Sequence, residues 1–564
     1  MQLNGARILI ECLIREGVNI IFGYPGGSVL DIYDELPQYG EQLRHVLVRH
    51  EQAAVHAADG YARATGKVGV CMATSGPGAT NTVTGIATAY CDSIPMVIFT
   101  GQVPTGLIGN DAFQEVDIAG ITRPCTKHNY VVKDVKDLAK VVRQAFYLAR
   151  SGRPGPVLVD LPKNVLQGSA EFVWPEDVSL RSYNPTYRPN YAQSRKVVDA
   201  LYNAERPLLF GGGGVIMSNA SEEFRNLAKN LSIPVTCSLM GLGAFPCDHP
   251  QWLGMLGMHG TYAANKAVSN ADLLIAVGVR FDDRVTGRLS SFAPKATIVH
   301  IDIDPTSIHK NVNVRIPVVG DCRNSLVAIR EHLAAREPLP WKERFAAWQG
   351  QLDEWRQEQP ITWTPGETTI KPQEVIKAVD KITEGKAILT TEVGQHQMWA
   401  AQLYNFTEPR TLLTSGGLGT MGYGFPAAIG AQFAYPNKLV IDVSGDGSFQ
   451  MNLQELITAV SNKLPVKVLL LNNGCLGMVR QLQDLFYGGR LNAVDIPDQP
   501  DFVKLAEAYG AEGYRVAKLE DLESTLRTAF ASPNTAIIDV IVERDENVYP
   551  TVPSGASLDE MLLL

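Results

Sequence analysis

The sequence predicts an α/β protein with three doubly wound parallel-sheet domains, and three observations carry this prediction. The chain has 564 residues, which at roughly 150 residues per domain is long enough for three or four domains. Short β-branched runs such as KVGVCMAT, ADLLIAVGV and VKVLLLNN alternate with stretches of helical periodicity. These runs are apolar throughout, which is typical of strands that helices cover on both faces.

Two stretches interrupt this alternation and divide the chain. Residues 181–193 are rich in Pro, Asn and Tyr, a composition typical of a surface linker. Residues 336–372 hold four of the seven tryptophans, and the spacing of Trp341, Trp348 and Trp355 places them on one helical face. An acidic charge balance favours a helix packed on a domain surface over an aromatic stripe that stacks bases. We therefore expect domains over 1–182, 192–335 and 372–564, with a linker over 336–371.

Composition and charge exclude several classes of protein. The 59 acidic residues outnumber the 50 Lys and Arg residues, and no basic run is interleaved with aromatic residues, so we expect no nucleic-acid partner. No apolar run approaches the roughly 18 residues of a membrane helix, and the N-terminus begins with an amphipathic pattern. The eight cysteines lack metal-ligand spacing and predict small core residues in a reducing compartment, the cytoplasm.

The third unit contains a motif that predicts a metal and phosphate site. A strand expected over 439–444 ends at G-D-G, a helix follows through NLQELITAV, and a second strand over 466–471 ends at N-N. A right-handed crossover would bring both strand ends to one edge of the sheet, where Asp446 and Asn473 would meet. Carboxylate, amide and backbone carbonyl oxygens suit Mg²⁺. Gly445 lets backbone N–H groups approach phosphates, although a tight turn alone would also explain G-D-G.

G-D-G followed by N-N at this spacing resembles the fingerprint of the thiamine diphosphate enzyme superfamily. The resemblance implies that Asp446, Asn473 and the carbonyl of Cys475 hold the metal. It also implies a Glu that pairs with N1′ of the cofactor's aminopyrimidine, and RHEQAAVHAADGYARATGK supplies Glu51 at the start of an expected helix. A first-turn carboxylate favoured by the helix dipole is the plainer interpretation. The flanking runs FGYPGGSVLDIYD and CMATSGPGATNTVTGIATAY match the pyrimidine-binding domain of the superfamily and favour the cofactor role.

Motifs along the whole chain indicate a closer relationship. GYPGG, RHEQAA, DAFQE, SGRPGPVLVDLPK, GMLGMHG, VGVRFDDRVTG, VGQHQMWAAQ and SGGLGTMGYGFPAAIGA occur in this order. They resemble the catalytic subunits of acetohydroxyacid synthases (acetolactate synthases). The resemblance implies that pyruvate is decarboxylated on thiamine diphosphate and that the hydroxyethyl unit condenses with a second pyruvate or with 2-oxobutyrate. This is the first common step of branched-chain amino acid biosynthesis.

The same resemblance assigns most site residues. Thiamine diphosphate would contact Gly26, Gly27, Glu51, Gln395, His396, Gly419, Met421, Gly445 and Ser448. The catalytic residues would be Glu51, Gln114, Lys163 and Arg284, and the substrate would contact Phe113, Lys163, Met478 and Leu482. Arg284 would supply a cation for the carboxylate of the acceptor.

The middle unit carries the glycine run PLLFGGGGVI. By itself this run is weak support for a dinucleotide, because it departs from G-x-G-x-x-G and no acidic residue follows about 20 residues on. The resemblance implies FAD in this domain, bound by Arg153, Gly212, Gly213, Gly214, Met240, His259, Arg280, Asp302 and Asp321. The family reaction has no net redox change, so we expect a structural flavin.

Three alternatives to a synthase remain at this point. An FAD-dependent pyruvate oxidase shares the three domains and the cofactors, but RFDDRVTG and GMLGMHG resemble the synthase. Glyoxylate carboligase lacks the activating Glu, which is present here as Glu51. A non-catalytic paralogue would be expected to lose Glu51, Asp446 or Asn473, and all three are intact. The resemblance further implies a homodimer or tetramer with the active site at the subunit interface, and a small regulatory subunit.

One position departs from the family pattern. In NNGCLGMVRQLQDLFYGGR, Leu482 occupies the place where most family members carry Trp. In the family that indole faces the acceptor substrate beside the arginine matched by Arg284, and it stacks on sulfonylurea-type inhibitors. A core leucine is the plainer interpretation. The departure predicts a weak preference for 2-oxobutyrate and resistance to sulfonylureas.

Overall fold

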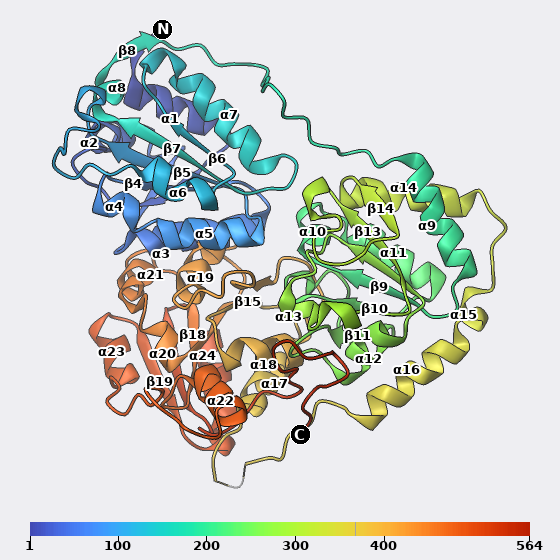
Figure 1. Cartoon of the computed structure of the whole chain (residues 1–564). Coiled ribbons are helices and arrows are strands. Elements are labelled where there is room, and N and C mark those ends of the chain that lie inside the picture. The colour runs from blue at the N-terminus through green and yellow to red at the C-terminus, as the bar shows by residue number, and fades with distance from the viewer. Residues whose placement is uncertain (367) are drawn as a thin grey trace.

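The structure is a computed structural model that describes residues 1–366 and 368–564. Within these residues the chain forms three six-stranded sheets, all parallel, and one antiparallel pair, β1 (Gln2–Asn4) with β8 (Ser169–Glu171). Each large sheet belongs to a separate domain, coloured blue, green and orange to red along the chain in Figure 1. The predicted α/β class with three doubly wound sheets is confirmed.

The first sheet has the strand order β3-β2-β4-β5-β7-β6. Its strands are β2 (Ile20–Gly23), β3 (Arg44–Leu47), β4 (Gly69–Ala73), β5 (Met96–Gln102), β6 (His128–Val131) and β7 (Pro156–Pro162). One face packs against α1 (Gly5–Arg15) and α7 (Leu138–Arg150), and the other against α3 (Glu51–Thr65) and α5 (Val83–Asp92). Burial of β4, β5 and β7 on both faces explains their continuous apolar runs.

The third sheet repeats this topology with the order β16-β15-β17-β18-β20-β19. Its strands are β15 (Ile388–Thr391), β16 (Leu412–Leu413), β17 (Val440–Gly445), β18 (Lys467–Asn472), β19 (Glu512–Val516) and β20 (Ala536–Ile541). The helices α17 (Pro372–Thr383), α18 (Gln395–Leu403) and α24 (Leu519–Ala531) cover one face, and α19 (Gly424–Ala434), α21 (Leu456–Ser461) and α23 (Phe502–Ala508) cover the other. In both sheets the strand order reverses beside the first strand, which is where open α/β sheets bind ligands.

The central sheet has a different order, β11-β10-β9-β12-β13-β14, which is typical of dinucleotide-binding domains. Its strands are β9 (Pro207–Gly211), β10 (Val235–Cys237), β11 (Trp252–Met255), β12 (Leu273–Val277), β13 (Thr297–Asp302) and β14 (Ile316–Val319). The order reverses between β9 and β12, so the glycine run after β9 lies at the switch point. Helices α9 (Tyr191–Asn203), α11 (Ser221–Leu231) and α14 (Cys322–Ala334) cover one face, and α12 (Tyr262–Asn270) lies on the other.

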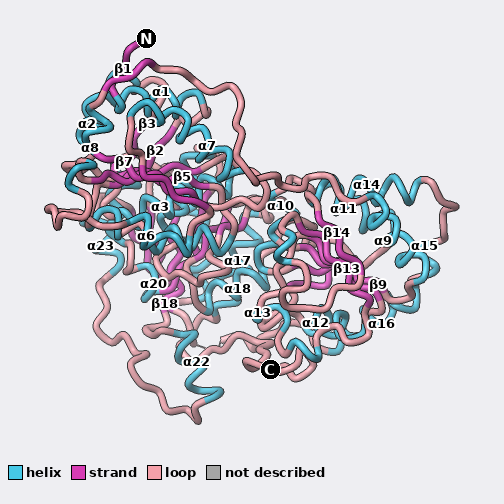
Figure 2. Tube along the Cα trace, turned by 45° about the horizontal axis from the view of Figure 1, so that its top comes forward, coloured by secondary structure: helices cyan, strands magenta, loops and turns pink. Residues whose placement is uncertain are grey.

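The tryptophan-rich segment forms two helices instead of one. Phe345 separates α15 (Trp341–Arg344) from α16 (Ala346–Glu358). The expected single face therefore fails for Trp341, whereas Trp348 and Trp355 lie on α16 with their ring centroids 5.8 Å apart. The ring of Phe345 is buried in the central domain together with Trp341. Trp348 donates from Nε1 to the carbonyl of Pro207 (3.0 Å), and α16 packs on the central domain as expected. Figure 2 shows this segment along the outer side of the central sheet.

The first and third domains touch through two helices, α3 and α19, which lie side by side in Figure 1. A Cβ at Gly60 would collide with the carbonyl oxygen of Ala427, and a Cβ at Gly430 would collide with that of Ala57. The two backbones therefore approach each other at a distance that only glycine allows. This contact fixes the first sheet relative to the third within one chain.

Two further expectations concern the burial of the cysteines and the absence of a membrane-spanning helix. Within the described ranges all eight cysteines are free thiols; Cys12, Cys71, Cys237, Cys322 and Cys475 are buried, whereas Cys91, Cys125 and Cys247 are half-buried. The expectation of core cysteines therefore holds for the first five only. Among the helices of those ranges, none combines the length and apolarity needed to cross a membrane.

Candidate active site

A small cavity of about 80 Å³ lies at the carboxyl ends of β15 and β17, where the strand order of the third sheet reverses. It is lined by the predicted cofactor and metal residues Gln395, His396, Met421, Gly445, Asp446, Ser448, Asn473 and Cys475. β17 and β18 are parallel neighbours, with Gly445 opposite Leu471. The expectation that Asp446 and Asn473 meet at one edge is confirmed, whereas their roles as metal ligands stay predictions.

The helix expected after G-D-G is shorter than the sequence predicts. Asp446 opens a single turn, α20 (Asp446–Phe449), and a 3₁₀ turn over Leu453–Glu455 precedes α21. Asn452 lies between the two turns, and its Nδ2 donates to the carbonyl of Gly422 (2.6 Å). This long-range hydrogen bond draws the chain out of helical geometry. The turn that carries Asp446 is thereby tied to the loop that follows Met421.

Burial makes Asp446 a strong candidate for cation binding. The residue is 1% exposed, and burial raises the pKa of its carboxyl to about 6. Gln499 donates from Nε2 to Oδ2 of Asp446, and the side-chain oxygen of Asn473 accepts from the N–H of Cys475 (3.2 Å). A buried carboxylate that lacks a charged partner is costly, and a divalent cation would offset that cost.

His396 and Gln395 supply an independent test of whether the cavity fits a diphosphate. His396 Nε2 and Gln395 Oε1 are buried and have no hydrogen-bond partner among the described residues. Unpartnered buried polar atoms are rare in native proteins and often mark a missing ligand or ion. Burial lowers the pKa of His396 to about 4, against the effect of the backbone carbonyl of Glu392, so its ring is neutral at pH 7 and carries a single N–H. Nε2 can donate to a phosphate oxygen in the tautomer that places this proton on Nε2 instead of on Nδ1 beside Glu392. The residues present therefore fit a diphosphate with its cation.

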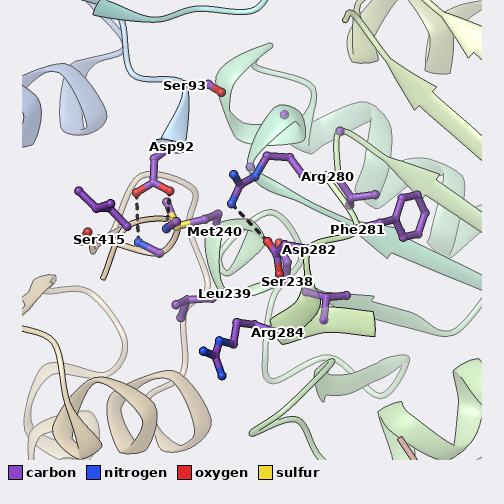
Figure 3. Close-up of a pocket in the computed structure, with 18 of the residues that line it drawn as sticks. Asp92, Ser93, Ser238, Leu239, Met240, Arg280, Phe281, Asp282, Arg284 and Ser415 are labelled. Atoms are coloured by element: carbon purple, nitrogen blue, oxygen red, sulfur yellow. Dashed lines mark hydrogen bonds and ion pairs between the residues drawn. The ribbon is translucent and has the colours of Figure 1, made fainter. Parts of the chain in front are cut away.

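A second cavity of about 910 Å³ adjoins the first and is lined by all three domains (Figure 3). Val393, Gly394, Met421, Met478 and Val479 line both cavities, so the two share a wall. Of the residues predicted to bind FAD, this cavity is lined by Arg153, Gly213, Gly214, Met240, His259, Arg280, Asp302 and Asp321. The volume lies within the range of cofactor sites, roughly 300 to 1,000 Å³.

The glycine run and two charged groups test the fit of a dinucleotide. A Cβ at Gly214 would lie 2.6 Å from Cα of Gly278, so the loops after β9 and β12 meet directly at the switch point. Gly212 is not among the described residues that line the large cavity. Its N–H donates to the carbonyl of Val277 (3.0 Å). Arg280 pairs with Asp282 (3.2 Å), whose Oδ1 is buried without a partner in the described ranges. The glycine backbone without side chains and the unpartnered Oδ1 of Asp282 beside the cavity fit a large polar cofactor.

The far wall of the large cavity carries the predicted acceptor residues. Arg284, in the short helix α13 (Asp283–Thr286), is mostly exposed and donates from Nη1 to the sulfur of Met258 (3.2 Å). Met478 and Leu482 lie on α22 (Gly477–Phe486) and line the same cavity. Leu482 is half-buried against this space, so it is not an enclosed core leucine. The structure places positions 284 and 482 in one cavity.

The residues of the first domain that were predicted to contact thiamine diphosphate or substrate lie elsewhere. Glu51 opens α3, is 9% exposed and accepts from Nδ2 of Asn81 (2.9 Å). Lys163 donates to the carbonyl of Gly27 (3.1 Å), and Phe113 is 88% exposed. Gln114 packs against Gly76, and Gly26 against Thr74, at the switch point between β2 and β4. In the part of the chain that the structure describes, none of these residues lines either cavity, so one chain does not bring Glu51 and Asp446 together.

Sequence reasoning missed several residues that shape the site. Asp92 accepts from the N–H groups of Gly416 (3.1 Å) and Gly417 (2.8 Å) and pairs with Arg63 (2.9 Å), as Figure 3 shows for the loop beside Ser415. This carboxylate of the first domain thus holds the third-domain loop that leads to Gly419. Asp92 opens the motif DSIPMV, but nothing in its spacing indicates a long-range partner. Glu392 and Gln499 were missed for the same reason.

Comparisons with known proteins agree with this geometry. Family models for the thiamine pyrophosphate enzymes match the N-terminal TPP binding domain at residues 3–121, the central domain at 194–329 and the C-terminal TPP binding domain at 392–540. The chain is 51% identical over 570 residues to the acetolactate synthase isozyme 3 large subunit of Escherichia coli, covering 100% of this chain and 99% of that one. It is 50% identical to the acetolactate synthase large subunit of Haemophilus influenzae (100% and 98% covered) and 50% identical to the acetolactate synthase of Mycobacterium leprae (99% and 90%). The chain therefore belongs to the thiamine pyrophosphate enzyme family and, within it, to the acetolactate synthase large subunits.

Proposed function

We propose that this acetolactate synthase joins two molecules of pyruvate, or pyruvate and 2-oxobutyrate, at the junction of the two cavities. The observation that carries the proposal is that the two cavities share a wall. Met421 and Met478 line both the cavity that contains Asp446 and Asn473 and the cavity that contains Arg284. A cofactor held by its diphosphate at one end can therefore meet an oxoacid held by its carboxylate at the other.

The chain's own residues have separable tasks in this reaction. When bound, thiamine diphosphate supplies the electron sink for decarboxylation and carbon–carbon bond formation. Asp446, Asn473 and the carbonyl of Cys475 would hold Mg²⁺, which would neutralise negative charge on the diphosphate. Arg284 would orient the acceptor through its carboxylate. Glu51 would hold and return a proton at N1′ of the aminopyrimidine.

FAD is the proposed occupant of the large cavity. Support comes from its position at the switch point of the central sheet and from its lining of arginines, glycines and acidic residues. The reaction transfers no net electrons, so the flavin would act as a structural element. It would fill the space between the domains and help to fix the wall that carries Arg280 and Arg284.

Two copies of the chain are needed to complete the proposed site. Glu51 and Asp446 lie at the carboxyl edges of two different sheets and line no common cavity within the described residues. A twofold dimer would place the first-domain edge of one copy against the third-domain edge of the other, and would create two equivalent sites. A tetramer would contain two such pairs.

A small regulatory subunit is the further partner we propose. The relatives from Escherichia coli and Haemophilus influenzae are named as large subunits, which implies a small subunit beside each of them. We expect a second, shorter chain to copurify with this one from its native host and to raise its activity.

The proposed function is tested by assaying acetolactate formation from pyruvate while thiamine diphosphate, Mg²⁺ and FAD are omitted in turn. The expected result is that omission of thiamine diphosphate or Mg²⁺ stops product formation and that removal of FAD lowers it. Peroxide formation at the rate of pyruvate consumption, with reduced flavin, would instead support a pyruvate oxidase.

The Leu482→Trp variant should strengthen the preference for 2-oxobutyrate as acceptor by roughly 10- to 200-fold, the range for one methylene in an apolar pocket. Leu482 lines the cavity beside Arg284, so an indole at this position would add apolar surface next to the acceptor's ethyl group. The parent should prefer 2-oxobutyrate weakly and resist sulfonylureas. Product ratios with both oxoacids present measure the preference.

A matched control for this variant is Leu491→Trp. Leu491 is exposed after the end of α22 and is not among the described residues that line either cavity. The control should leave the product ratio unchanged. A strong preference in the parent that Leu482→Trp does not alter would remove position 482 from acceptor selection.

A further inference from the structure

Glu392 occupies an unusual place for a carboxylate. It is the first residue after β15 and precedes the Val393–His396 stretch that lines the diphosphate cavity. Its side chain is 0% exposed, and its backbone N–H donates to the carbonyl of Val443 in β17 (3.0 Å). Buried carboxylates are rare unless they are bonded at both oxygens, so its partners indicate its role.

Those partners come from two loops that carry predicted thiamine diphosphate residues, and Glu392 itself begins the third. Oε2 of Glu392 accepts from the N–H of Gly422 (2.6 Å) and from Oγ of Ser448 (2.7 Å). Oε1 accepts from the N–H of Phe425 (3.2 Å), in the first turn of α19. Gly422 directly follows Met421, and Ser448 lies in the turn that begins at Asp446. One carboxylate therefore joins the 393–396, 419–422 and 445–448 loops.

A second buried carboxylate lies behind the first. Asp442 in β17 is 0% exposed and accepts from Oγ1 of Thr390 (3.0 Å) and from the hydroxyl of Ser444. Burial raises the pKa of Glu392 to about 7, and burial together with the charge of Glu392 raises the pKa of Asp442 well above its usual range. Two neighbouring buried carboxylates cannot both ionise cheaply, so a single negative charge on the pair is favoured over two.

The hydrogen-bond donors decide where that proton resides. The backbone N–H groups of Gly422 and Phe425 can only donate, so both oxygens of Glu392 must accept. The hydroxyls of Thr390 and Ser444 can turn and accept instead, so Asp442 can be protonated without loss of a partner. The hydroxyl of Ser448 can turn as well, but the two backbone N–H groups cannot, and this asymmetry favours the charge on Glu392 and the proton on Asp442.

We propose that the Glu392 carboxylate is a positioning residue that holds the three cofactor loops of the third domain in the register required to bind thiamine diphosphate. The inference rests on the proposed assignment of these loops to the cofactor. Glu392 lies behind the cavity and is not among its described lining residues, so it acts through Gly422 and Ser448 and not by contact with the cofactor.

The Glu392→Gln variant sets an amide NH₂ group against a backbone N–H in either orientation of the side chain. In the apoprotein the three loops can move apart and relieve this repulsion between the amide and the backbone N–H group. Thiamine diphosphate binds only when the loops are in register, so binding must restore the repulsion. We expect the Kd for thiamine diphosphate with Mg²⁺, measured by calorimetry on the apoprotein, to rise roughly 10-fold or more. The Asp442→Asn variant replaces a neutral acid with a neutral amide and should leave the Kd within about threefold of the parent.

A third variant separates positioning from general stability. Glu16 is a buried carboxylate of the first domain that pairs with Arg143 (2.6 Å) and Arg150 (2.8 Å), remote from the third-domain loops. Glu16→Gln should lower the melting temperature of the apoprotein and leave the Kd unchanged. A Glu392→Gln variant that lowers the melting temperature alone, with the parent's Kd, would overturn the inference.

Equal Kd increases in Glu392→Gln and Asp442→Asn would also overturn it, because the ionised member would then not be Glu392. The parent apoprotein is the reference for the proposed function. If the parent itself fails to bind thiamine diphosphate, the assignment of the loops is wrong. If the parent binds and Glu392→Gln binds equally well, the positioning role alone is wrong.

Discussion

The Glu51→Gln variant should lose about 10²- to 10⁴-fold of its turnover in acetolactate formation, the range associated with a positioned acid–base group. Glu51 is 9% exposed and accepts a hydrogen bond from Asn81, so an isosteric amide fits the same space. Gln cannot take up and return a proton at N1′ of the aminopyrimidine. The fold and the binding of FAD should persist, as measured by circular dichroism and flavin absorbance.

Glu35→Gln is the matched control. Glu35 is also 9% exposed in the first domain, where it accepts from Nδ2 of Asn4 (2.8 Å) and pairs with Arg7 (3.2 Å), away from the sheet edge that carries Glu51. This variant should change stability and leave kcat within about twofold. A Glu51→Gln enzyme with nearly the parental kcat would exclude Glu51 from proton transfer.

The Asp446→Ala variant should lose Mg²⁺-dependent binding of thiamine diphosphate, with a Kd increase above about 100-fold, because it removes the charged ligand of the proposed metal site. Titration of the apoprotein with thiamine diphosphate at fixed Mg²⁺ measures this loss. Binding with the parent's Kd and the parent's dependence on Mg²⁺ would contradict the assignment.

Asp446→Asn adds a test based on stability. Burial raises the pKa of Asp446 to about 6, so the folded apoprotein binds this proton more tightly than the unfolded chain does. The contribution of Asp446 to apoprotein stability therefore falls as the pH rises through 6. A neutral Asn avoids this loss, so the variant apoprotein should melt at a higher temperature than the parent at pH 8, with a smaller difference at pH 5.

The sequence allowed the third-domain site to be predicted because two adjacent parallel strands fix the distance between their ends. Asp446 and Asn473 follow β17 and β18, and sheet geometry alone brings them to one edge. The same logic applies to Gly213 and Gly214 after β9, which lie at the switch point of the central sheet. Contacts that depend on strand order could therefore be predicted from the sequence.

Contacts that depend on how loops return across the sheet could not be predicted from the sequence. Glu392 and Asp442 lie 50 positions apart in apolar strand contexts, and neither has a spacing motif that predicts a partner. The helix is also interrupted at Phe345, whose ring packs into the central core, and the heptad spacing of the tryptophans does not indicate this interruption. Both features follow from long-range packing, which local periodicity does not encode.

In the proposed assembly one chain supplies Glu51 and another supplies Asp446 to the same active site. To test this arrangement, the inactive Glu51→Gln and Asp446→Ala chains are mixed, their subunits are exchanged and acetolactate formation is assayed. Random pairing makes half of the dimers mixed, and each mixed dimer contains one intact site of two, so recovery of about a quarter of the parental activity is expected. No recovery after subunit exchange has been verified by mass spectrometry would show that the two residues do not meet across an interface.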